Sequence, residues 1–213
     1  MKSKAKRSGE PDKGEQKTAV ASEIVQEEYG NYWIKAGRLS GNFVARAFPK
    51  NNANCQGLMA EATGASEDDA IAALKVLLDE REAKRNVARR WEIRSQIFVP
   101  SKEEFVEAIR QTHLSGPQIA MLKAHALAGE QGLAKIVMMN ASGYRSIATA
   151  NKAFARAGAI IGEFLGVAIA SEDRTLANRT ACVLGFGEGD DRSVPDVWFT
   201  HEELRAAVKI ALH

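Results

Sequence analysis

Apolar residues recur with a helical period between residues 147 and 165. One face of this segment collects small or apolar side chains, namely Ile147, Ala150, Phe154, Gly158, Ile161 and Leu165. That spacing predicts one long helix with a continuous buried stripe. A shorter apolar segment, residues 133–141, precedes it, and Gly143 suits the left-handed conformation that ends such a helix. The pattern therefore predicts a short helix, a tight turn and a longer helix.

The long helix also carries a polar face on the side away from the apolar stripe. This face comprises Arg145, Thr149, Lys152 and Arg156, and Ser146 lies beside them at the expected N-cap. A helix that reads DNA presents cations and hydrogen-bonding side chains from its first turns to the major groove. We therefore take these five residues as candidate DNA-binding residues. Because any surface helix is polar outside, a plain solvated face is an equal alternative.

Two short extended segments are predicted after the long helix. Residues 180–187 and 197–200 are rich in strand-forming residues, and residues 188–195 between them are dense in turn formers. Residues 200–203 form a capping-box pattern that opens a last helix. Three helices followed by a hairpin, over residues 115–212, resemble the winged helix-turn-helix family. The resemblance implies a domain that reads duplex DNA.

The tip of the predicted hairpin departs from that family in its charge. Glu188, Asp190 and Asp191 lie there against a single cation, Arg192. Acidic groups repel phosphate, so this hairpin is not expected to grip DNA. Either it stays clear of the duplex or it faces a protein partner.

The N-terminal half has the periodicity of a small α+β module. Residues 31–39 and 42–48 are rich in aromatic and β-branched residues and flank a Ser-Gly turn, which predicts a hairpin. Residues 57–63 predict a third strand, and Ser66 is expected to cap a helix whose first turn is acidic.

Part of this module resembles a known family. Over residues 32–82, the run ARAFP, then Cys55, then the run SEDDAIAALK is similar to the small domain of HicB-like antitoxins. That resemblance implies a compact sheet domain that contacts a protein partner or assembles into oligomers. A generic α+β module accounts for the same pattern equally well.

The helix of this module is predicted to turn strongly basic beyond Leu78. Its cations are Arg81, Lys84, Arg85, Arg89, Arg90 and Arg94, and Val87 and Trp91 continue an apolar ridge. We take Arg85, Arg89 and Arg90 as further candidate DNA-binding residues on a helix that contacts phosphate. The equal alternative is a solvated face with Glu–Arg pairs, whose Trp91 packs between domains.

Length and composition are those of a chain with one large or two small domains. It has 213 residues, of which 45% are hydrophobic and 26% charged, and a net charge of +2. Nucleic-acid binding must therefore come from local patches. We predict an α+β chain, with a small three-stranded sheet-plus-helix domain at residues 29–97 and a mainly helical, winged-helix-like domain at residues 101–213. Residues 1–28 are predicted to be a disordered polar tail with a basic tip, and the sequence leaves open whether residues 19–29 begin a short helix or a strand.

No set of residues points to catalysis or to a bound metal. The four histidines lack metal-binding spacing, and Cys55 and Cys182 lie far apart, which indicates free thiols in a cytoplasmic protein. No apolar run is long enough to span a membrane. We therefore expect no cofactor, no catalytic residues and no membrane partner.

The expected function is that of a non-catalytic DNA-binding protein. It would act as a transcriptional regulator or a DNA-reading accessory protein, with double-stranded DNA as its partner. The alternative is an antitoxin-like accessory subunit that binds a protein partner or further copies of the chain. An enzyme is the least favoured class, because no group of titratable residues is available for one.

Overall fold

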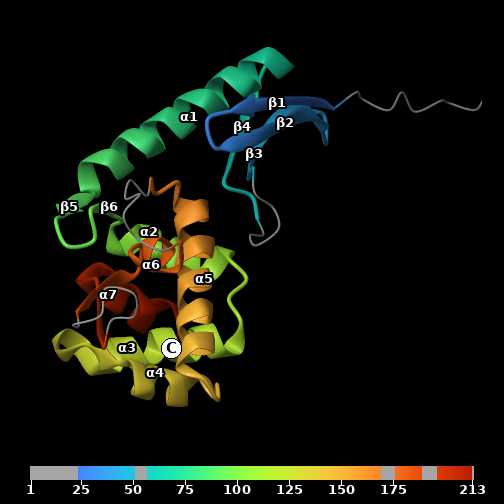
Figure 1. The fold of residues 1–213 in the computed structure, drawn as a ribbon. Helices are drawn as coiled ribbons and strands as arrows, with labels where there is room; N and C mark the ends of the chain where they lie inside the picture. Colours follow the sequence, from blue (N-terminus) through green and yellow to red (C-terminus); the bar gives the residue numbers. More distant parts are fainter. Residues whose placement is uncertain (1–23, 51–56, 169–175, 189–195, 213) are drawn as a thin grey trace, which may run out of the picture.

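The structure is a computed structural model of the chain that describes residues 24–50, 57–168, 176–188 and 196–212. It is a mixed α+β protein in which a four-stranded antiparallel sheet is followed by a mainly helical part (Figure 1). The α+β class predicted from the sequence is therefore confirmed. The predicted tail up to residue 23 lies outside the described residues.

The N-terminal sheet consists of strands in sequence order. They are β1 (Val25–Tyr29), β2 (Tyr32–Leu39), β3 (Asn42–Pro49) and β4 (Ala60–Gly64), and helix α1 (Glu67–Ala88) covers one face (Figure 1). The predicted hairpin and the helix cap are confirmed, since Ser66 accepts a hydrogen bond from the backbone N–H of Asp69 at 3.1 Å. The sheet has one strand more than predicted.

The additional strand corrects the prediction that residues 25–28 belong to a disordered tail. β1 is held to α1 by polar contacts: the hydroxyl of Tyr29 donates to Asp79 at 2.8 Å, and Lys75 lies 2.9 Å from Glu27. A strand fixed by such long-range polar pairs leaves little hydrophobic periodicity in the sequence. Without that periodicity, the sequence pattern alone does not identify β1.

The basic helix ends earlier than predicted. α1 stops at Ala88, and the chain then forms a two-stranded hairpin of β5 (Arg90–Glu92) and β6 (Ile97–Val99). Trp91 therefore does not extend a helical ridge with Val87, which is 88% exposed. It instead contacts Phe98 across the hairpin, with ring centroids 5.1 Å apart.

The second half contains helices around a small sheet. The helices are α2 (Lys102–Gln111), α3 (Gly116–Ala128), α4 (Lys135–Ser142), α5 (Ile147–Leu165), α6 (Leu176–Ala181) and α7 (Glu202–Ala211), with a short 3-10 turn, η1 (Gly129–Gln131). The strands β7 (Leu133–Ala134), β8 (Gly185–Glu188) and β9 (Val197–Thr200) form an antiparallel sheet in the order β7-β9-β8. The predicted helices and the β8–β9 pairing are thus present in these residues.

Two boundaries differ from the prediction. Residues 180–184 are not part of a strand, because α6 and a turn occupy them and β8 starts only at Gly185. Thr200 is not the cap of the last helix, since it pairs with Gly185 in the sheet and His201 takes the N-cap position.

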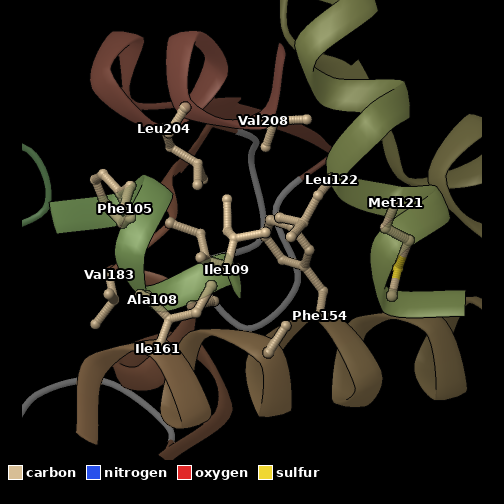
Figure 2. Packing of buried hydrophobic residues seen from close by; sticks show 14 of the residues in the cluster. Phe105, Ala108, Ile109, Met121, Leu122, Phe154, Ile161, Val183, Leu204 and Val208 are labelled. Atoms are coloured by element: carbon tan, nitrogen blue, oxygen red, sulfur yellow. The ribbon is translucent and has the colours of Figure 1, made fainter. Parts of the chain in front are cut away.

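The core of the second half lies between α2, α3, α5 and α7. Figure 2 shows Phe105 and Ile109 from α2, Leu122 from α3 and Ile161 from α5 converging with Leu204 of α7. All five side chains are at most 6% exposed. This shared core makes α5 an integral part of the domain.

One histidine lies inside this core without a hydrogen-bond partner. His125 of α3 is 2% exposed, its ring centroid lies 4.9 Å from that of Phe154, and neither ring nitrogen has a partner in the described structure. Burial lowers the pKa of His125 from 6.5 to about 4. The folded state therefore favours the neutral imidazole, because a charge there would lose its hydration.

We expect His125 to make the protein acid-sensitive. A pKa of about 4 in the folded protein against 6.5 for the free side chain stabilises the fold above pH 6.5. That contribution, about 3 kcal/mol, is lost as the pH falls toward the folded-state pKa. His125→Leu should reduce the loss of unfolding free energy between pH 7 and pH 4.5, measured by urea denaturation. His113→Leu at an exposed position is the control, and equal pH dependence of both variants would contradict the prediction.

Candidate nucleic-acid interface

The turn between α4 and α5 has the geometry that the sequence predicted. Gly143 is left-handed, with φ 72°. Its N–H donates to the carbonyl of Asn140 at 3.1 Å, and the N–H of Tyr144 donates to that of Met139 at 3.3 Å. These bonds satisfy the carbonyls at the end of α4. Ser146 occupies the N-cap of α5, but its side chain makes no capping hydrogen bond.

α5 is fixed along its inner face. The predicted apolar stripe is buried from Ala150 to Leu165, and only Ile147 at its start is half-buried. The ring of Phe154 lies 5.6 Å from that of Trp198 on β9. The side-chain amide of Gln118 on α3 donates to the carbonyl of Ala153 at 3.1 Å. The outer face of α5 is therefore presented on a rigid support.

The candidate residues of α5 lie on this outer face. Arg145, Ser146, Thr149, Lys152 and Arg156 are all exposed. In the part of the chain that the structure describes, no carboxylate pairs with any of the three cations. We call this group the α5 cationic face. Its charge is uncompensated, so it is available to an anionic ligand.

The basic residues at the end of α1 are placed differently. The Arg85 side chain is 7% exposed, and its Nε lies 3.4 Å from Glu104 on α2. Arg89 donates from Nη2 to Glu104 at 2.6 Å and to the carbonyl of Leu165 at 2.7 Å. Arg81 of α1 pairs with Glu107 of α2. These arginines join the sheet domain to α2 and to the end of α5.

Arg90 is likewise engaged within the protein. It lies on β5, with its Nε 2.6 Å from Glu203 on α7 and its Nη1 2.8 Å from Glu92. The hydrogen bonds to Glu203 and Glu92 raise the pKa of Arg90 above its ordinary value. The interpretation of Arg85, Arg89 and Arg90 as DNA-binding residues is therefore not supported by their positions, because protein carboxylates already neutralise them. Local periodicity cannot reveal such partners.

The remaining sequence candidates lie partly outside the described residues. Glu188 at the end of β8 is exposed and lies 3.7 Å from Arg94, whereas Asp190, Asp191 and Arg192 of the predicted hairpin tip fall outside, as does Cys55. Cys182 is buried. Among the described residues, no group of His, Cys, Asp and Glu has the arrangement of a metal site.

Comparisons of the chain with protein-family models, with curated proteins and with solved structures found no significant match. Within the described ranges, no helix combines the length and apolarity needed to cross a bilayer. The fold and the α5 cationic face are therefore the basis on which a function can be proposed.

Proposed function

We propose that the chain is a non-catalytic DNA-binding protein whose second half is a winged helix-turn-helix that reads duplex DNA through α5. The observation that carries this proposal is the α5 cationic face, which is exposed, has no ion-pair partner among the residues that the structure describes, and lies opposite the buried stripe of the same helix. Arginine and lysine on the first turns of such a helix can reach base edges and phosphates in a major groove.

The order of the elements supports the same proposal. β7 lies between α3 and α4, the tight turn at Gly143 joins α4 to α5, and the β8–β9 hairpin follows. The pairing of β9 with β7 ties the hairpin to the helices, through Leu133 opposite Trp198. This is the arrangement that positions one helix to enter a groove and a hairpin beside it. α6, between α5 and β8, is an addition to that arrangement.

The hairpin is assigned no phosphate contacts in this proposal. Glu188 is exposed at the end of β8, and the sequence that follows adds two acids. Negative charge at that place would repel the duplex backbone. We therefore attribute the DNA affinity to the α5 cationic face. The role of the hairpin in this proposal is to support α5.

The test compares duplex binding by the wild type and by Arg145→Ala/Lys152→Ala/Arg156→Ala. Loss of three phosphate or base contacts should weaken binding at least about thirtyfold and reduce the slope of log K against log salt by about three. Fluorescence anisotropy with mixed-sequence duplexes at two salt concentrations measures both quantities. The three side chains are exposed, so the fold should be retained.

A matched control removes the same charge elsewhere. Lys84, Lys102 and Lys209 are exposed cations on α1, α2 and α7. Replacing all three by alanine should change duplex affinity by less than about threefold, because only distant electrostatics is altered. Equal weakening by the control and the α5 variant would contradict a specific interface on α5.

A protein-binding function is the second candidate, and one surface favours it. The β5–β6 hairpin exposes Trp91, Ile93 and Phe98 to 52%, 77% and 57%. Clustered exposed apolar side chains mark contacts with other proteins. If the wild type fails to bind any duplex at low salt, an antitoxin-like, protein-binding function replaces the proposed DNA-binding function.

A further inference from the structure

Helix α1 carries apolar residues on two opposite sides. Its inner side packs on the N-terminal sheet and buries Ala70, Ile71, Leu74 and Leu78. Its outer side exposes a second apolar row, which we call the α1 outer stripe and which comprises Ala72, Val76, Ala83 and Val87. A surface helix normally turns a polar side to water, and a helix that is apolar on both sides is normally covered on both. The α1 outer stripe is therefore a surface that a partner is expected to cover.

The α1 outer stripe is open to solvent along its whole length. Val76 is 57% and Val87 is 88% exposed, and the two alanines are exposed as well. Leu77, at 44% exposed, lies beside Val76 at the edge of the stripe. In Figure 1, α1 runs along the border of the molecule, with the sheet on its other side. The described residues of the same chain therefore leave this side of α1 free.

The spacing of the stripe is symmetric about the middle of α1. Residues 72, 76, 83 and 87 are separated by four, seven and four positions, which keeps them within an arc of about 60° on the helix. Along the chain they alternate small, large, small, large. When two copies of α1 pack antiparallel, Val76 of one copy faces Ala83 of the other, and Ala72 faces Val87. Each large side chain then meets a small one, as close helix packing requires.

A parallel pair of helices lacks this match. Each residue of a parallel two-fold pair meets its own copy, so that valine would face valine and alanine would face alanine. The valines would then hold the helices apart and leave gaps at the alanines, against the close packing of protein interfaces. Symmetric spacing is a requirement only where a surface meets itself, as in an isologous dimer. The pattern therefore selects a second copy of this chain in the antiparallel orientation.

The apolar area of the stripe is enough for a dimer at the small end of the stable class. Together with Ala73 and Leu77 beside it, the stripe exposes about 400 Å² of apolar surface. Because interfaces are about 60% apolar, this corresponds to about 650 Å² from each copy. The total of about 1,300 Å² lies within the range of about 1,200–2,000 Å² for specific, stable contacts.

The charge at the centre of the stripe sets the expected effect of salt. Glu80 is exposed and lies next to the midpoint between residues 79 and 80, so an antiparallel pair brings two glutamates to the same side. Salt screens the repulsion between exposed like charges. The contact is otherwise apolar, so added salt should leave the dimer unchanged or tighten it.

We propose that the chain forms an antiparallel dimer through the α1 outer stripe, with Val76 of each copy packed on Ala83 of the other and Val87 on Ala72. The inference uses residues of α1 alone and does not depend on the proposed function of α5. It gives the second apolar side of α1 a partner, and it places two α5 cationic faces in one particle.

The test is the oligomeric state of the full chain, measured by sedimentation equilibrium between about 1 and 300 μM, where a dimer of this size should dissociate. Val76→Ala opens a gap opposite Ala83, and Ala83→Val sets two valines against each other. Each change occurs twice in the dimer and should raise the dissociation constant at least about tenfold. The double variant Val76→Ala/Ala83→Val exchanges large and small and should return the constant to within about threefold of the wild type.

Val137→Ala is the matched control, because Val137 is 47% exposed on α4 and loses the same atoms. It should leave the dissociation constant unchanged. A wild type that stays monomeric throughout would overturn the proposal, and so would a double variant that dimerises no better than the single ones. Equal weakening by Val137→Ala, or a dimer that dissociates on addition of salt, would likewise contradict an apolar contact on α1. Recovery in the double variant alone supports the antiparallel pair.

Discussion

Replacing Glu104 by alanine is expected to lower the free energy of unfolding by about 3–5 kcal/mol, because it leaves buried arginines without their counter-charge. The Glu104 side chain is 6% exposed. Its carboxylate oxygen Oε1 lies 3.4 Å from Nε of Arg85 and 2.6 Å from Nη2 of Arg89. It also accepts the backbone N–H of Ser101 at 2.9 Å, which caps the first turn of α2. A single carboxylate therefore anchors α1, α2 and, through Arg89, the end of α5.

Two further variants separate the charge from the other roles of this residue. Glu104→Gln keeps the size and the capping oxygen, so a loss close to that of alanine would assign the effect to the ion pairs. Glu103→Ala is the control, because Glu103 is 74% exposed and pairs with exposed Lys102, a contact that solvent screens strongly, so its loss should change the free energy of unfolding far less. Urea denaturation measures the free energy of unfolding of all three variants. Similar values for Glu104→Ala and Glu103→Ala would show that the network does not hold the domains together.

The local signals in the sequence predicted most of the elements. The Gly143 turn, the stripe on α5 and the caps at Ser66 and Ser101 each depend on residues within one or two turns, so short patterns suffice. The outward placement of Arg145 and Lys152 followed for the same reason: once the buried stripe is known, the opposite face of the helix is fixed.

The features that the sequence did not reveal depend on partners far along the chain. Arg85 and Arg89 have the same local pattern as cations on a solvated face, and only the fold places Glu104 against them. The end of α1 at Ala88 is another case: the hairpin that follows is closed by pairing of Arg90 with Val99. Tertiary contacts of this kind override helical periodicity.

Gly158 in the middle of α5 should not tolerate alanine, although alanine is the better helix former. A Cβ at Gly158 would overlap the carbonyl oxygen of Thr180 and lie 2.8 Å from the carbonyl carbon. These are backbone atoms at the end of α6, so relief requires the two helices to separate. Overpacking of this kind costs about 3 kcal/mol, which outweighs the gain of about 1 kcal/mol from helix propensity.

The control is Gly116→Ala, because Gly116 starts α3, has no positive φ, and a Cβ there would meet nothing within 4 Å. It should leave stability unchanged or raise it by up to about 1 kcal/mol. The two substitutions are chemically identical, so opposite signs in urea denaturation would isolate the close approach of α5 and α6. If Gly158→Ala is neutral or stabilising, that approach is looser than described. α5 could then shift relative to its support, and the rigid presentation of the α5 cationic face would lose its structural basis.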